Sequence, residues 1–202
     1  MLRIDLYVIG REDRAATIPT TTGHLLVVAD GAGGTGDGAH AADAVLAAVT
    51  TAATTAATTP PELTSAAACA ALLAHLDSTL RRGETTAALA VILGDTIHGA
   101  SVGDSGAWLI DPHGGIHDLS EHQRRKPLLG SGRATPVPFT ATLGPATLLL
   151  ATDGLFNYCP RDRITALANS PDLEGLATRL CDLPRLRSGA LPDDIAVILA
   201  RR

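Results

Sequence analysis

Residues 24–34 have the sequence HLLVVADGAGG, in which a short apolar run ends abruptly at Asp30 and a glycine-rich turn. An apolar run of this length, bounded by turn residues, predicts a strand that is buried on both faces. The chain of 202 residues is long enough to shield such a strand from water on both sides of a sheet. Asp30 is therefore expected at the end of a buried strand, next to a tight turn.

Strand and helix patterns extend outward from this segment. Alternating or continuous apolar residues predict strands over residues 2–9, 85–93, 96–102, 106–110, 147–152 and 195–200. Helical spacing predicts helices over residues 37–59, ended by Pro60-Pro61, over 63–82, and more weakly near 161–169 and 172–182. The strands between residues 85 and 110 are expected to form a meander, with Gly94-Asp95 joining the first two. No linker or fixed repeat divides the chain, so a single domain over residues 1–202 is predicted.

The composition argues against several functional classes. The net charge is −5 and aromatic residues are scarce, so neither a polyanion nor stacked bases would be attracted, and no nucleic-acid partner is expected. No apolar stretch approaches the roughly 18 residues that a membrane span needs. Residues 1–10 alternate in polarity instead of forming a signal peptide. We therefore expect a cytoplasmic protein without membrane contact.

Acidic residues recur at the ends of the predicted strands. They are Glu12-Asp13, Asp30, Asp104 and Asp153, which follow strands, and Asp193, which precedes one. Because the end of one antiparallel strand lies beside the start of the next, these carboxylates are candidates to meet at one rim of the sheets. Such a cluster repels itself unless a hard divalent cation binds there. Two such ions activate a shared water and hold a phosphoryl group, whereas the alternative is that each Asp is only a turn residue.

Short segments in a fixed order carry a family resemblance. They are ED at 12–13, VADGAGG at 28–34, TTA at 85–87, SVGDS at 101–105, LATDGL at 150–155 and PDDIAV at 192–197. Together they resemble the signature set of the metal-dependent protein phosphatases, the type 2C or PPM family. The resemblance implies an α+β fold, a four-layer αββα sandwich of two antiparallel β-sheets flanked by helix pairs. The metals would lie at one end of the sheets.

The resemblance also implies a set of metal ligands. Asp30 is expected to bridge two ions of Mn²⁺ or Mg²⁺. Glu12 and the Gly31 carbonyl would bind one of these ions. Asp153 and Asp193 would bind the other.

Further roles follow from the same resemblance. Asp13 is expected to orient a metal-bound water, so that it joins Asp30 and Asp153 as the catalytic residues. Asp104 matches an acidic residue that helps to hold a third, weaker ion. The implied activity is hydrolysis of phosphoserine and phosphothreonine by a metal-bridging water. The implied partners are phosphorylated proteins, the substrates of a Ser/Thr kinase.

The chain also departs from the family pattern. Val8 stands where the family has a phosphate-binding Arg, and a lost charged hydrogen bond weakens binding by roughly ten- to a hundredfold. Arg11, Arg14 and Arg133 are candidates to compensate. Milder departures are Ala32, Glu84, Asp194 and a shortened connection between Asp104 and Asp153, which implies a reduced flap beside the site.

Other functions fit the sequence less well. Gly31, Gly33 and Gly36 match the G-x-G-x-x-G pattern of dinucleotide-binding enzymes, but Asp30 would put a negative charge beside the pyrophosphate. A metal site at His113 and His117 is disfavoured because their segment is a turn. The charge run at 121–126 is predicted to be a solvated loop.

A regulatory protein that keeps the fold without activity is the main alternative to an enzyme. The absence of the phosphate-binding Arg, where Val8 stands, favours it. The retained ligands Glu12, Asp30, Asp153 and Asp193 favour the enzyme, because a lapsed site has no need of them.

Overall fold

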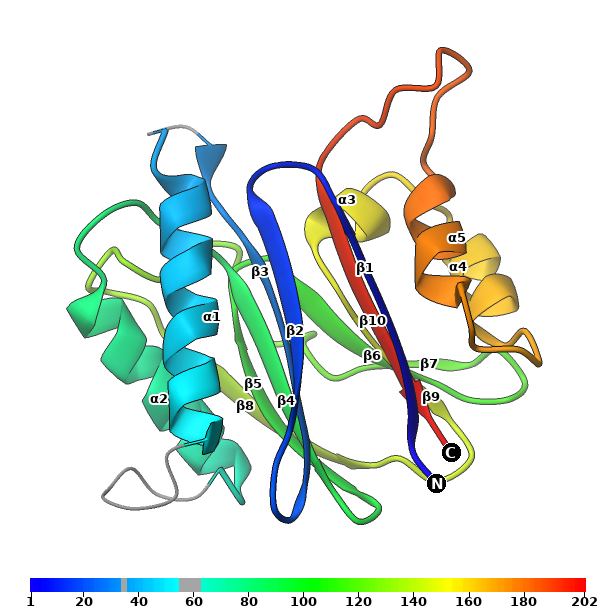
Figure 1. The fold of residues 1–202 in the computed structure, drawn as a ribbon, viewed down its shortest axis with the longest axis horizontal. Coiled ribbons are helices and arrows are strands. Elements are labelled where there is room, and N and C mark those ends of the chain that lie inside the picture. The colour runs from blue at the N-terminus through cyan, green and yellow to red at the C-terminus, as the bar shows by residue number, and fades with distance from the viewer. Residues whose placement is uncertain (34–35, 55–62) are drawn as a thin grey trace.

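Two antiparallel β-sheets form the centre of the molecule in a computed structural model, which describes residues 1–33, 36–54 and 63–202 (Figure 1). The first sheet has the strand order β1 (Arg3–Ile9), β10 (Ile195–Arg201), β9 (Thr147–Ala151), β6 (Gly106–Ile110) and β7 (Ile116–Asp118). The second has the order β2 (Asp13–Pro19), β3 (Gly23–Asp30), β4 (Ala87–Leu93), β5 (Thr96–Val102) and β8 (Val137–Thr142).

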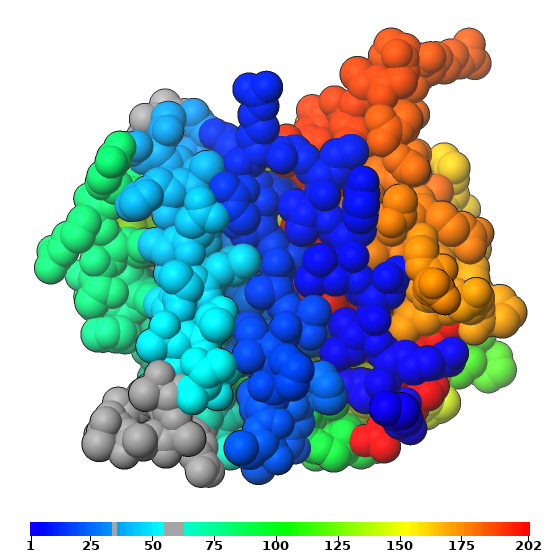
Figure 2. All heavy atoms as spheres, in the orientation of Figure 1, coloured from blue at the N-terminus to red at the C-terminus, as the bar shows by residue number. Residues whose placement is uncertain are grey.

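Helices cover the outer face of each sheet. The second sheet is covered by α1 (Gly38–Thr54) and α2 (Ala66–Thr79), and Figure 2 shows the atoms of α1 lying against those of β2. The first sheet is covered by α4 (Arg161–Ala168) and α5 (Leu176–Asp182), and the single turn α3 (Asp153–Phe156) follows β9. This arrangement is the predicted four-layer αββα sandwich. No helix in the described ranges is long and apolar enough to cross a membrane.

The central strands are buried on both faces, as the continuous apolar runs predict. In β3, Leu25 and Val27 pack under the helices, and Leu26 and Val28 pack between the sheets. The strand β10 follows the same rule, because alternate residues face the helices and the other sheet. One apolar layer between the sheets thus joins both halves of the chain, and a single domain over residues 1–202 stays a prediction.

The predicted meander is wrong for its third strand. The β4–β5 hairpin forms as expected, but β6 crosses to the other sheet and pairs with β7 and β9. The crossing takes place at residues 103–105, where Gly103 has φ +89°, a conformation that favours glycine. This change of sheet carries Asp104 to the rim between the two sheets.

Several elements have no counterpart in the predictions. They are β2, β7, β8 and the single-turn helix α3. The predicted helix over 63–82 is present as the shorter α2, and the one over 37–59 is present as α1 as far as Thr54, with residues 55–59 outside the described ranges. The expected stop at Pro60-Pro61 lies outside the described residues.

Candidate metal centre

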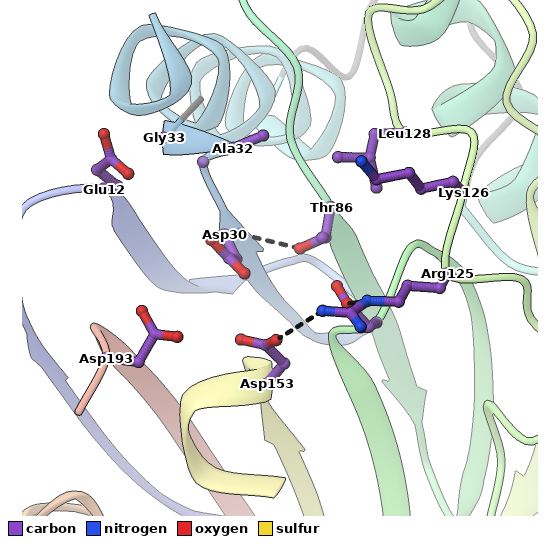
Figure 3. A pocket seen from close by; sticks show the side chains of 12 residues that line it. Glu12, Asp30, Ala32, Gly33, Thr86, Arg125, Lys126, Leu128, Asp153 and Asp193 are labelled. Atoms are coloured by element: carbon purple, nitrogen blue, oxygen red, sulfur yellow. Dashed lines mark hydrogen bonds and ion pairs between the residues drawn. The ribbon is translucent and has the colours of Figure 1, made fainter. Parts of the chain in front are cut away.

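The predicted acidic residues meet at one rim of the sandwich. Asp30 ends β3, Asp104 lies in the β5–β6 crossing, and Asp153 opens α3 directly after β9. Asp193 precedes β10, and Glu12 lies in the turn between β1 and β2. Together with other side chains they surround a pocket of about 350 Å³ (Figure 3). Its lining residues are Glu12, Asp30, Gly31, Ala32, Gly33, Thr86, Asp104, Arg125, Lys126, Leu128, Asp153 and Asp193.

Three of the carboxylates form a compact group. Asp30, Asp104 and Asp153 each offer an oxygen atom within 4.8 Å of the others. Glu12 and Asp193 lie across the pocket from Arg125 in Figure 3, with their carboxylates facing the same space. The five predicted carboxylate ligands therefore share one pocket.

Backbone pairing fixes the end of β3. Asp13 and Asp30 are opposite each other in the β2–β3 ladder. The Asp30 carbonyl accepts hydrogen bonds from the Thr86 amide at 2.9 Å and from the Thr85 hydroxyl at 2.8 Å. The Thr86 hydroxyl in turn accepts from the Asp30 amide at 3.0 Å. The Asp30 backbone is thus held to the two residues that precede β4, at the floor of the pocket.

Small residues after Asp30 leave room for the acidic side chains. A Cβ atom on Gly33 would lie 2.5 Å from the Glu12 Oε2, and one on Gly31 would lie 2.3 Å from the Gly38 backbone. The Glu12 amide donates to Asp194 Oδ2 at 2.7 Å, which ties the β1–β2 turn to the start of β10. The glycine-rich turn is therefore needed to let α1 and Glu12 approach the strand end.

The sequence profile of the protein phosphatase 2C family matches residues 9–130, which is more than half of the chain. The chain belongs to the protein phosphatase 2C family. A comparison with curated proteins finds no match.

Solved structures share the protein phosphatase 2C fold seen here. The serine/threonine phosphatase Stp1 from Staphylococcus aureus has a TM-score of 0.80 and 21% identity, covering 100% of this chain and 95% of that one. The catalytic domain of the serine/threonine phosphatase PstP, solved with two manganese ions, has a TM-score of 0.77 and 22% identity, covering 99% and 97%. PppA from Pseudomonas aeruginosa has a TM-score of 0.78 and 19% identity, covering 99% and 97%. These likenesses confirm the fold.

In this member of the protein phosphatase 2C family, the ionised forms of the acidic side chains in the pocket are unfavourable when no cation is bound. Burial, followed by the nearby charges of Asp13 and Asp153, raises the pKa of Asp30 to about 9. Burial raises the pKa of Asp13 to about 7 and also raises the pKa of Asp153. Among the described residues, the buried Asp13 Oδ2 has no hydrogen-bond partner. Raised pKa values and an unsatisfied buried oxygen fit a site that takes a hard divalent cation and its waters.

Two basic residues of the pocket were not predicted as site residues. Arg125 and Lys126 belong to the charge run that was predicted to be a solvated loop, and both are indeed exposed, but they also line the pocket. The arginines that were expected to compensate for Val8, which are Arg11, Arg14 and Arg133, do not line it. Sequence alone gave no signal for Arg125, because its position depends on contacts far along the chain.

The raised carboxyl pKa values predict how stability depends on pH in the metal-free protein. Between the ordinary pKa of 3.8 and about 9, Asp30 binds more protons in the folded than in the unfolded state. Stability therefore falls as pH rises through this window. Thermal unfolding in EDTA should show the melting temperature falling from pH 5 to pH 9, and Asp30→Asn should flatten that slope. A slope that Asp30→Asn leaves unchanged would contradict the assignment.

Proposed function

We propose that this chain is a metal-dependent protein serine/threonine phosphatase that hydrolyses phosphoserine and phosphothreonine. The observation that carries the proposal is the meeting of Asp30, Asp104 and Asp153 within 4.8 Å at the rim of a protein phosphatase 2C fold. Mn²⁺ or Mg²⁺ suits this oxygen-rich set. PstP, which shares the fold, was solved with two manganese ions.

The residues present fit two such ions. Asp30 is placed between the other acidic groups and would bind both ions, and Asp153 and Asp193 would bind one of them (Figure 3). Glu12 and the Gly31 carbonyl would bind the other ion, and no hydrogen bond within the described residues occupies that carbonyl. We assign Asp104 to a third, weaker ion. When bound, such ions acidify water and neutralise phosphoryl oxygens, which is the chemistry that phosphomonoester hydrolysis needs.

Asp13 has a separate role in this proposal. It is 2% exposed, it lies opposite Asp30 in the β2–β3 ladder, and its buried Oδ2 has no hydrogen-bond partner among the described residues. We infer that Asp13 accepts a hydrogen bond from the attacking water and orients it. The pocket lies at an exposed rim of the sandwich, so a phosphorylated segment of another protein has access to it. The proposed substrates are the products of a Ser/Thr kinase, and a cytoplasmic location stays a prediction.

Removal of the metal tests the proposal directly. Turnover of a phosphoserine peptide and of p-nitrophenyl phosphate should require Mn²⁺ or Mg²⁺, stop in EDTA and return when Mn²⁺ is added in excess. Asp153→Asn should lose activity at all metal concentrations, while Asp162→Asn, an exposed change on α4, should match the wild type. Equal rates with Mn²⁺, in EDTA and for Asp153→Asn would rule the mechanism out. Metal binding without turnover would favour a regulatory protein instead.

A further inference from the structure

The pocket contains an acidic side and a basic side. The acidic side is formed by the five carboxylates, and the basic side by Arg125 and Lys126, which reach in from the connection between β7 and β8 (Figure 3). Among the described lining residues, these two are the only ones with a positive charge. A phosphoryl group carries negative charge on its outer oxygens, so it needs a cationic partner on the side away from the carboxylates. Val8 cannot serve, because its side chain has no charge and packs against the apolar layer between the sheets.

The loop that carries the basic pair is held at both ends. On one side, Gln123 Nε2 donates to the Ser105 carbonyl at 2.8 Å, next to Asp104. On the other side, Leu129 and Thr85 exchange two backbone hydrogen bonds of 3.0 and 3.1 Å. Only a few residues separate the two anchors, so Arg125 is kept at the pocket despite its exposure.

The guanidinium of Arg125 has donors to spare. Its Nε donates to Asp104 Oδ2 at 2.6 Å, and its Nη2 lies 4.0 Å from Asp153 Oδ2, which is too far for a hydrogen bond. Neither Nη atom donates a hydrogen bond within the described part of the chain. The side chain is 75% exposed, and an ion pair this exposed is weak and easily rearranged. The planar Nη groups are therefore free to bind two oxygens of one phosphoryl group.

We propose that Arg125, assisted by Lys126, binds the phosphoryl group of the substrate in place of the missing arginine on β1. This inference rests on the proposed phosphatase function and assigns the phosphate-binding side of its pocket. Arg125 forms the direct contact, because its side chain already points at the carboxylate cluster (Figure 3). Lys126 adds charge without a fixed geometry.

Binding of inorganic phosphate to the Mn²⁺-loaded protein, measured by calorimetry, tests the inference without requiring turnover. Arg125→Ala should weaken phosphate binding by about ten- to a hundredfold, the effect of one charged hydrogen-bonding group. Arg125→Lys should recover part of the loss. Lys126→Ala should weaken binding by no more than about fivefold, as for an exposed charge. Arg124→Ala removes a neighbouring exposed arginine that does not line the pocket, and should match the wild type.

Two further measurements separate phosphate binding from other effects. With a phosphoserine peptide, Arg125→Ala should raise KM by a factor similar to the loss in phosphate affinity. The affinity for Mn²⁺ should change much less than the affinity for phosphate. If Arg125→Ala binds phosphate like the wild type, or loses Mn²⁺ to the same extent as phosphate, the inference is overturned. If the wild type binds phosphate through Arg125 but never hydrolyses a substrate, the proposed function fails while the binding assignment stands.

Discussion

Asp30→Asn is expected to abolish Mn²⁺-dependent phosphatase activity, with a loss of at least about a thousandfold. Charge stabilisation by bound metal supplies several kcal/mol to a reaction of this kind, and each 1.36 kcal/mol corresponds to a factor of ten in rate. Substitution of Asp30 is expected to lower activity more than substitution of any other ligand, because Asp30 lies between the groups assigned to both ions (Figure 3). An amide at this position keeps the shape of the side chain and removes the charge that a bridging ligand needs.

The same substitution should have the opposite effect on the metal-free protein. At pH 8, Asp30 is ionised in the unfolded wild type, whereas its pKa in the folded protein is raised to about 9. Folding therefore costs free energy, because Asp30 must either take up a proton or stay ionised beside Asp13 and Asp153. Asp30→Asn removes this conflict, so its melting temperature in EDTA should equal or exceed that of the wild type. Excess Mn²⁺ should raise the melting temperature of the wild type, because a ligand that binds only the folded state stabilises it, and should leave the variant unchanged.

Asp162→Asn provides the matched control for Asp30→Asn. It makes the same chemical change at an exposed position on α4, away from the pocket. Its activity and its response to Mn²⁺ should match those of the wild type. If Asp30→Asn retained a tenth of the wild-type activity, or were stabilised by Mn²⁺ as strongly, Asp30 would not be a shared metal ligand.

The parts of the fold that were predicted from sequence are those where burial leaves a periodic pattern. The core strands β3, β4 and β10 are nearly continuous apolar runs, because they are covered on both faces. The strands β2 and β8 lie at the two edges of one sheet and have few large apolar residues, so no pattern marks them. Tertiary packing decides which sheet β6 joins, and the alternation of apolar and polar residues along the strand cannot reveal it.

The site divides in a similar way. Its carboxylates are encoded locally, because each one lies within three residues of a predicted strand, and strand ends of neighbouring antiparallel strands meet at one rim. The basic side is not encoded locally. Arg125 reaches the pocket because residues distant in the sequence, among them Ser105 and Thr85, hold its loop. Long-range contacts of this kind have no signature in a single sequence.

Asp77 makes several long-range contacts to the same loop. It lies on α2, is 6% exposed, and accepts hydrogen bonds from three backbone amides of the loop that follows Arg125. The Gly130 and Gly132 amides donate to Oδ1 at 2.9 and 3.0 Å, and the Ala134 amide donates to Oδ2 at 2.9 Å. One carboxylate therefore satisfies donors that have no partner in a sheet or helix.

Asp77→Ala is expected to lower the free energy of unfolding by about 2–4 kcal/mol, since three hydrogen bonds from partly buried amides are lost and each contributes about 0.5–1.5 kcal/mol. A loss of this size is a large fraction of the roughly 5–15 kcal/mol that stabilises a typical domain. Urea unfolding at pH 7 measures it, with Ser78→Ala, an exposed change at the next position of α2, as the control.

Asp77→Asn keeps one acceptor oxygen and should lose less stability. In the fraction of Asp77→Asn that is folded, phosphate affinity should still fall, because the loop beyond Arg125 is no longer fully anchored. A change in unfolding free energy below about 0.5 kcal/mol for Asp77→Ala, the range of an ordinary surface substitution, would show that the loop holds its position without this carboxylate.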